Sequence, residues 1–158
     1  MEKLSTNFLK AAIILLALPV LALGLRGLLG LFNHPARPDY AWILYPLVIV
    51  LYLSVIPYFT ALYQAFKLVT YIEQHISFSE LSNQALKKIK WCAMIISGLY
   101  LLIMPFVYHL AQMDDAPGLV LMGFLPVFAS LIITVFAAVL QRILREAIQF
   151  KTENELTV

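Results

Sequence analysis

Five side chains of the types that bind divalent cations lie close to two short polar segments of this chain. His34 and Asp39 belong to the first segment. His109 lies just before the second segment, which contains Asp114 and Asp115. Imidazole and carboxylate groups together suit zinc or manganese. Their spacing matches no metal-binding motif, and solvated loop residues explain them better, so we predict no metal ligands and no cofactor.

Residue patterns of enzyme active sites are absent from the sequence. It contains no GxSxG, HExxH, P-loop or dinucleotide-binding fingerprint, and no nucleophile is visibly paired with a base. Cys92 is the only cysteine, so neither an internal disulfide nor a CxxC site can form. Its position in an apolar run predicts a small buried hydrophobic side chain. We therefore expect no enzymatic activity and predict no catalytic residues.

Most of the chain consists of four long apolar runs, and these indicate the class of protein. The 158 residues are 62% hydrophobic and 13% charged, whereas soluble domains average about 45–50% and 25%. Each run is long enough to cross the roughly 30 Å hydrocarbon core as a helix, and hydrocarbon offers backbone groups no partner outside their own helix. The sequence therefore predicts an all-α integral membrane protein with spans at about residues 8–32, 40–66, 91–110 and 119–140.

Basic residues are divided unequally between the two ends of these spans. Of the 11 Lys and Arg residues, only Arg26 and Arg37 lie toward one side, which leaves nine on the other. Lys and Arg near span ends are retained in the cytoplasm. The rule predicts cytoplasmic termini, a cytoplasmic helical loop at 67–90 and a cytoplasmic tail at 141–158. Short outer loops then give one domain, residues 1–158, as a compact up-down-up-down four-helix bundle in the inner (cytoplasmic) membrane of the cell.

A cleaved signal peptide is the alternative explanation for the first span. Lys3 and Lys10 resemble the charged n-region of such a peptide, and Ala22-Leu23-Gly24 resembles a cleavage site. The apolar stretch is long for a signal peptide, so a retained span is the favoured interpretation.

Arg26 is the one formally charged residue within a predicted span. A charge costs several kcal/mol at mid-membrane and much less near an interface. Because Arg26 lies near the outer end, snorkelling toward water is favoured over a buried ion pair with Asp39, Asp114 or Asp115. Every span also contains proline, and general tolerance of proline in membrane helices is favoured over a gating role.

The middle loop and the C-terminal tail hold the most specific patterns. Helix is expected from Lys67 to about His75, with a new start near residues 77–80, where Ser77 and Glu80 have capping-box spacing. The new helix has one apolar face beside lysines, as expected of an interfacial lead-in to the third span. The tail ends in acids followed by Leu-Thr-Val, which could bind in a groove or add to a sheet edge of another protein.

These two segments resemble DUF2975, a family of small bacterial four-span membrane proteins. The matching features are Phe78-Ser79-Glu80 with Asn83, then Leu86-Lys87-Lys88-Ile89, and the ending Glu153-Asn154-Glu155-Leu156-Thr157-Val158, in which Glu155 replaces the more usual Asp. Members are often encoded beside a small helix-turn-helix regulator of the Cro/C1 type, which the resemblance implies as a partner. The family has no established activity, so the resemblance supplies no catalytic residues.

The sequence thus leaves two functions open. The first is a non-enzymatic membrane partner of such a regulator, without direct nucleic-acid binding of its own. Its predicted partner-binding residues are Ser79, Glu80, Asn83, Lys87, Lys88, Glu153, Asn154, Glu155, Leu156, Thr157 and Val158. The second is a small transporter, channel or immunity-type protein, acting on a small apolar or lipid-like ligand as a monomer or homodimer. The lack of deep ionisable residues opposes an ion path.

Overall fold

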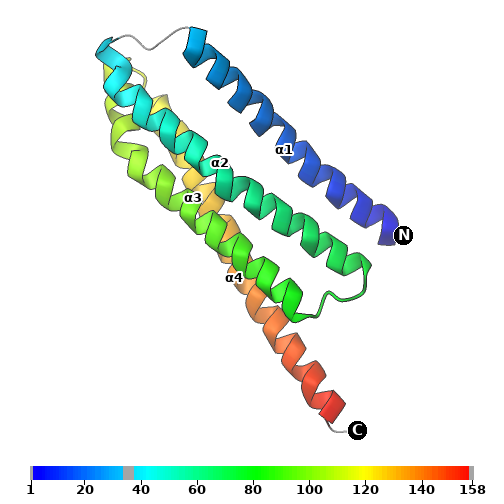
Figure 1. Ribbon diagram of the computed structural model, residues 1–158. Coiled ribbons are helices and arrows are strands. Elements are labelled where there is room, and N and C mark those ends of the chain that lie inside the picture. Colours follow the sequence, from blue (N-terminus) through cyan, green and yellow to red (C-terminus); the bar gives the residue numbers. More distant parts are fainter. Residues whose placement is uncertain (1, 34–37, 157–158) are drawn as a thin grey trace.

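The computed structural model describes residues 2–33 and 38–156, with side chains described for 6–30, 33 and 38–154. Long helices account for most of this part of the chain, which contains no strand. They run alternately up and down, which confirms the predicted all-α, four-helix architecture (Figure 1). The helices are α1 (Glu2–Asn33), α2 (Pro38–Glu73), α3 (Glu80–Met113) and α4 (Gly118–Leu156).

All four helices are long and apolar enough to cross a membrane. Each remains continuous through its internal prolines. Large apolar side chains, including those of Leu23, Ile132 and Phe136, point away from the protein on several helices. Such an apolar exterior is unfavourable in water and is expected of helices surrounded by hydrocarbon. The chain is therefore a multi-pass membrane protein.

The helices pack in the order of the sequence. Within the described residues, α1 contacts only α2, α2 also contacts α3, and α3 also contacts α4. The side of the bundle between α1 and α4 is consequently not closed by helix contacts, in contrast to the compact packing expected from the loop lengths. The residues of α1 are apolar on all sides of the helix, so contact with lipid is nearly as favourable for α1 as contact with protein.

The α3–α4 pair is the most tightly packed part of the fold. Small residues are buried on both helices, such as Ala93 and Ser97 of α3 and Ala137 of α4. At Gly123 of α4, an added Cβ atom would lie 3.1 Å from the Met104 sulfur of α3, so the glycine permits a close approach. Near one end of the pair, the Lys90 Nζ donates a hydrogen bond of 3.0 Å to Oε1 of Gln141.

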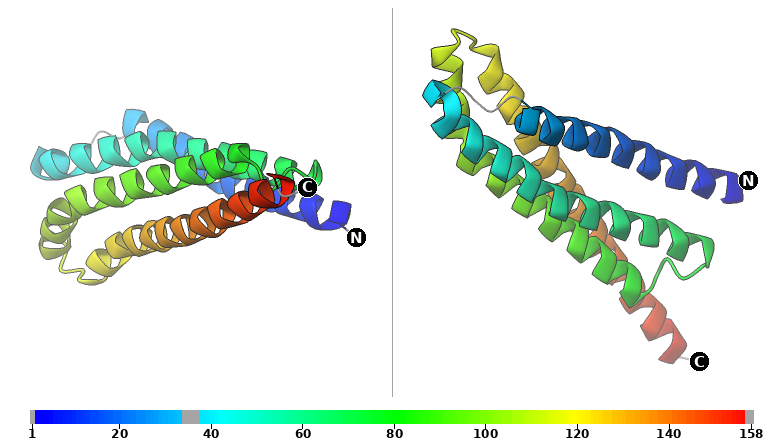
Figure 2. Two further views of the ribbon diagram at one scale, coloured as in Figure 1. Left: turned by 90° about the horizontal axis from the view of Figure 1, so that it is seen from below. Right: turned by 45° about the horizontal axis from the view of Figure 1, so that its top comes forward.

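Both termini and the α2–α3 connection lie at one end of the molecule (Figures 1 and 2). We call this the basic end and define it as residues 67–90 and 141–156. The connection contains His75 in the left-handed region at φ 56°, after which Ser79 begins α3 as its N-cap. The predicted cap at Ser77 is wrong, because the residues after α2 through Phe78 are not helical and Ser79, with φ −132° and ψ 159°, accepts the capping hydrogen bond of α3.

Candidate functional site

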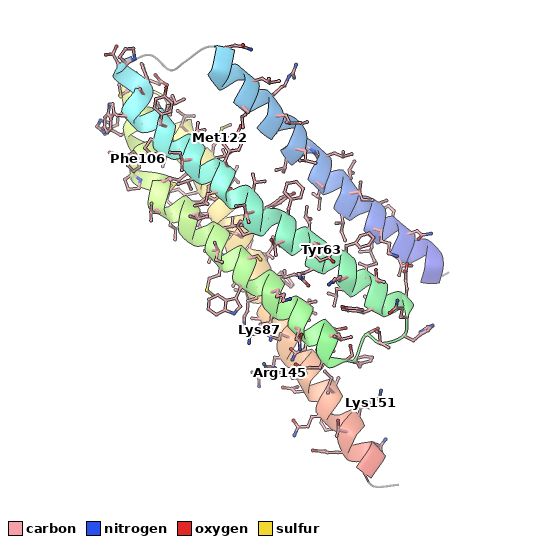
Figure 3. All side chains as sticks on the ribbon, viewed as in Figure 1. Tyr63, Lys87, Phe106, Met122, Arg145 and Lys151 are labelled. Carbon is pink, nitrogen blue, oxygen red and sulfur yellow. The ribbon has the colours of Figure 1, made fainter. Side chains whose placement is uncertain are left out.

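The last part of α4 extends past the other helices at the basic end. α4 has 39 residues and is therefore about 58 Å long, roughly twice the thickness of the hydrocarbon core. The part after Leu140 alone accounts for about 24 Å. Figure 3 shows Lys151 on this projecting segment. Because α4 is longer than the hydrocarbon core is thick, part of it must extend beyond the membrane, and its polar C-terminal turns are the part expected to do so.

A groove lies between the projecting part of α4 and the α2–α3 connection, and we call it the end groove. It has a volume of about 420 Å³. Its apolar side chains are those of Ile76, Phe78 and Ala147, and its polar ones are those of His75, Ser79 and Lys151. The Phe78 side chain is 62% exposed, and Phe150, one turn from Ala147 along α4, is 71% exposed. The end groove therefore combines exposed apolar surface with the positive charge of Lys151.

Three of the predicted partner-binding residues stabilise the start of α3. The Ser79 hydroxyl accepts a hydrogen bond from the Ser82 backbone N–H at 3.4 Å. The Asn83 side chain is buried, and its Nδ2 donates to Oε1 of Glu80 at 3.0 Å, while its Oδ1 has no partner within the described residues. Ser79 also lines the end groove. Asn83 is too buried to contact another protein directly.

The other predicted partner-binding residues lie on two separate surfaces. Lys87 and Lys88 are exposed on α3. Glu153 and Asn154 are exposed on the last turns of α4, where the Gln149 amide donates to Glu153 at 3.5 Å. The side chains of Glu155 and Leu156, and the whole of Thr157 and Val158, lie outside the described residues. Because α4 continues to Leu156, the described part of the tail is helical, which favours helix-in-groove recognition over addition to a sheet.

Sequence reasoning missed most of the end groove. His75, Ile76, Ala147 and Lys151 were not among the predicted site residues, although they line it together with Ser79. The helical spacing of apolar residues at 143–150 was the available signal, because it indicates that the helix continues past the span predicted at 119–140. Nothing in the sequence indicated which segment would lie beside it.

A second and larger cavity lies within the membrane spans, and we call it the intramembrane cavity. Its volume is about 640 Å³, and all four helices contribute to its wall. The lining includes Gly24 of α1, Tyr52 of α2, Tyr100 of α3 and Pro126 of α4, and it contains no charged side chain. A cavity of this size falls in the range of small-molecule binding sites, about 300–1,000 Å³.

Comparison with known proteins identifies the family. Residues 30–158 match the family described as protein of unknown function DUF2975. The chain belongs to the DUF2975 family. It is 49% identical over 160 residues, covering 100% of both chains, to the uncharacterized membrane protein YoaS of Bacillus subtilis (strain 168). No solved structure matches the chain.

The family match begins near the end of α1 and therefore covers the three helices that pack in succession. In this DUF2975 protein, α1 is attached to that unit mainly through α2. The Tyr52 hydroxyl donates to the Gly24 carbonyl at 2.6 Å, and the Tyr58 hydroxyl donates to the Leu16 carbonyl at 2.9 Å. At the basic end, Lys10 of α1 forms an ion pair of 2.5 Å with Glu73 of α2.

The end opposite the basic end offers little support for metal binding by this DUF2975 protein. The described residues contain no group of three or more His, Cys, Asp and Glu side chains arranged to bind a metal. His34 lies outside the described residues. His109 packs edge-on against Trp42 with ring centroids 5.3 Å apart, and Asp114 accepts a 3.1 Å hydrogen bond from Tyr40. Both side chains therefore have structural contacts.

Arg26 of the DUF2975 protein is exposed on the surface of α1. Among the ion pairs of the described residues, none joins it to Asp39, Asp114 or Asp115. This arrangement favours the snorkelling interpretation, in which the long side chain carries its charge toward the nearby interface.

Proposed function

We propose that this protein is a non-enzymatic regulatory component of the bacterial inner membrane that binds a small soluble protein at its basic end. The partner that the DUF2975 resemblance implies is a helix-turn-helix regulator of the Cro/C1 type. The end groove carries this proposal, because its exposed apolar side chains lie beyond the predicted spans 40–66 and 119–140 and beside the charge of Lys151.

The chemistry of the end groove defines what the partner must present. Ile76, Phe78 and Ala147 suit an apolar anchor, such as one face of an amphipathic helix. Lys151 lies at the groove, and Arg142, Arg145, Lys87 and Lys88 are exposed on the same end of the molecule. Acidic residues flanking the apolar anchor would complement these charges and orient the encounter. We therefore expect the regulator to dock through an acidic, amphipathic helix and not through its basic DNA-binding face.

Co-purification tests this proposal with single substitutions in the end groove. The full chain, extracted in detergent, is expected to retain a co-expressed helix-turn-helix regulator of the Cro/C1 type. Phe78→Ala and Lys151→Glu should each reduce recovery of the regulator, because they remove apolar area and reverse a charge. High salt should weaken the effect of Lys151→Glu and leave the effect of Phe78→Ala unchanged, since salt screens only the charge contribution.

A lipid-facing variant provides the control for that experiment. Phe136 is 66% exposed within the span of α4, so Phe136→Ala deletes a comparable exposed aromatic ring far from the basic end. It should leave recovery of the regulator unchanged. Equal recovery with the wild type, Phe78→Ala and Lys151→Glu, or no recovery with any of them, would contradict docking at the end groove.

A transporter or immunity-type protein that acts on an apolar or lipid-like ligand, alone or as a homodimer, is the second candidate. The intramembrane cavity favours it, because the cavity is bordered by helices that leave one side of the bundle without helix contacts. Its uncharged lining disfavours ions as the cargo. Proteoliposomes should then move a fluorescent lipid analogue between leaflets faster than protein-free vesicles. Equal rates would contradict transport and leave docking at the end groove unaffected.

A further inference from the structure

We propose that the intramembrane cavity binds a neutral single-chain amphiphile, a long apolar chain that carries one uncharged polar group such as a hydroxyl. The polar group would bond to the hydroxyl of Tyr100, and the chain would fill the apolar remainder. This site is separate from the end groove, and the inference does not depend on the docking proposed there.

The shape and lining of the cavity fit a long apolar chain. Beside the cavity of about 640 Å³ lies a smaller one of about 270 Å³. Val20, Leu51 and Val55, together with Tyr100 and Pro126, line both of them, so the two volumes adjoin. Neither wall contains a charged side chain. An ionised ligand would therefore lose its hydration without gaining an opposite charge.

Tyr100 is the polar group of the cavity wall that lacks a partner. The other hydroxyls around the two volumes bond to the backbone: Tyr52 to Gly24, Tyr58 to Leu16, Ser54 to Leu51 and Ser130 to Pro126. Within the described residues, the Tyr100 hydroxyl has no hydrogen bond. A hydroxyl left unpaired in an apolar site is unfavourable. A ligand that supplies a hydrogen-bonding group there would remove that cost.

The depth of Tyr100 distinguishes this ligand from ordinary membrane phospholipid. Tyr100 is central in the span predicted at 91–110, so its backbone lies about 15 Å from either surface of the hydrocarbon core. The ester and phosphate groups of a phospholipid lie at the interface and would not reach this depth. A small amphiphile can enter from the lipid between α1 and α4, which make no helix contact within the described residues.

Gly24 allows the cavity to be filled without disturbing the fold. It lines the cavity, and a Cβ atom added there would meet no atom within 4 Å. Leucine is also the better helix former, so Gly24→Leu should fold and place its side chain in the cavity. Gly98 supplies the matched control, because it is equally open, lies in α3 and does not line the cavity.

The test uses the purified full chain in nanodiscs and a photoactivatable hexadecanol as the probe. Labelling sites are read by peptide mass spectrometry, and unlabelled hexadecanol, hexadecane or phosphatidylcholine is added as competitor. In the wild type and in Gly98→Leu, the probe should label cavity residues, and unlabelled hexadecanol should reduce that labelling. Gly24→Leu should lose most of that labelling. Tyr100→Phe should weaken competition by hexadecanol about fivefold to tenfold, as expected for one lost hydrogen bond, and leave competition by hexadecane unchanged.

Three results would overturn the proposal, and a stability measurement serves as the control. Equal labelling of wild type and Gly24→Leu would place the probe outside the cavity. Equal competition by hexadecanol and hexadecane, with no effect of Tyr100→Phe, would mean that the cavity holds apolar chains without regard to a polar group. Full protection by phosphatidylcholine would identify the occupant as an ordinary lipid tail. Retained thermal stability of both leucine variants excludes misfolding as the explanation.

Discussion

Ser77 and Ser79 lie two residues apart, and only Ser79 caps α3. Ser79 has extended backbone angles, φ −132° and ψ 159°, and its hydroxyl bonds to the N–H of Ser82. Glu80, which the sequence pattern paired with Ser77, instead accepts a hydrogen bond from Asn83. A capping pattern in sequence specifies spacing alone, whereas the position of the cap depends on where the preceding turn ends. That turn is completed by His75 in the left-handed region, a conformation that the sequence did not indicate.

Alanine substitution should separate the two serines. Ser79→Ala should lower the free energy of unfolding by about 1 kcal/mol, because it removes the side-chain acceptor for an N–H of the first turn. Ser77→Ala should change it by less than about 0.5 kcal/mol, since a partly exposed residue outside a cap contributes little. Unfolding in mixed micelles with increasing SDS measures both. Equal losses would show that the cap is not specific to Ser79.

At the scale of whole helices, hydropathy predicted the four spans, which depend on local sequence. It did not predict the position of α1 or the end groove, which depend on contacts between distant segments. The four spans were predictable because each apolar run is continuous and about as long as a bilayer is thick. The position of α1 was not predictable, since a helix that is apolar on all sides has no face that indicates its neighbour. The end groove was missed for the related reason that residues 75–79 and 147–151 meet only in the fold.

The attachment of α1 depends on a few polar contacts with α2. The Lys10 and Glu73 side chains of the ion pair are only 23% and 28% exposed, and the Lys10 Nζ also lies 5.4 Å from the centre of the Phe66 ring. Because it is partly buried, this ion pair should contribute more to stability than a fully solvated pair would. In contrast, Arg142 and Glu146 form an exposed pair within a single helix.

Neutralising one acid of each pair tests this difference. Glu73→Gln should destabilise the α1–α2 contact by about 1 kcal/mol, and Glu146→Gln should have an effect below about 0.5 kcal/mol. Hydrogen exchange measured by mass spectrometry should show faster exchange in α1 of the Glu73→Gln variant, with α3 and α4 unchanged. Faster exchange throughout all four helices would contradict the view that α1 is a separately attached element.

For the whole molecule, the functional proposal depends on which side of the membrane holds the basic end. The fold places both termini and the α2–α3 connection at the same end (Figure 1), as an even number of spans requires. Nine of the 11 Lys and Arg residues lie toward that end, so the positive-inside rule predicts that it is cytoplasmic. A cytoplasmic regulator can reach the end groove only with this orientation.

Single-cysteine labelling in intact cells tests the orientation directly. The one native cysteine, Cys92, is buried, so it should react little with a membrane-impermeant maleimide, and Cys92→Ala removes it from the background. In that background, Asp115→Cys at the α3–α4 turn should react in intact cells from which the wall or outer layers have been removed. Lys151→Cys should react only after lysis. Labelling of Lys151→Cys before lysis would place the end groove outside the cell, and the proposed regulator could not then be its partner.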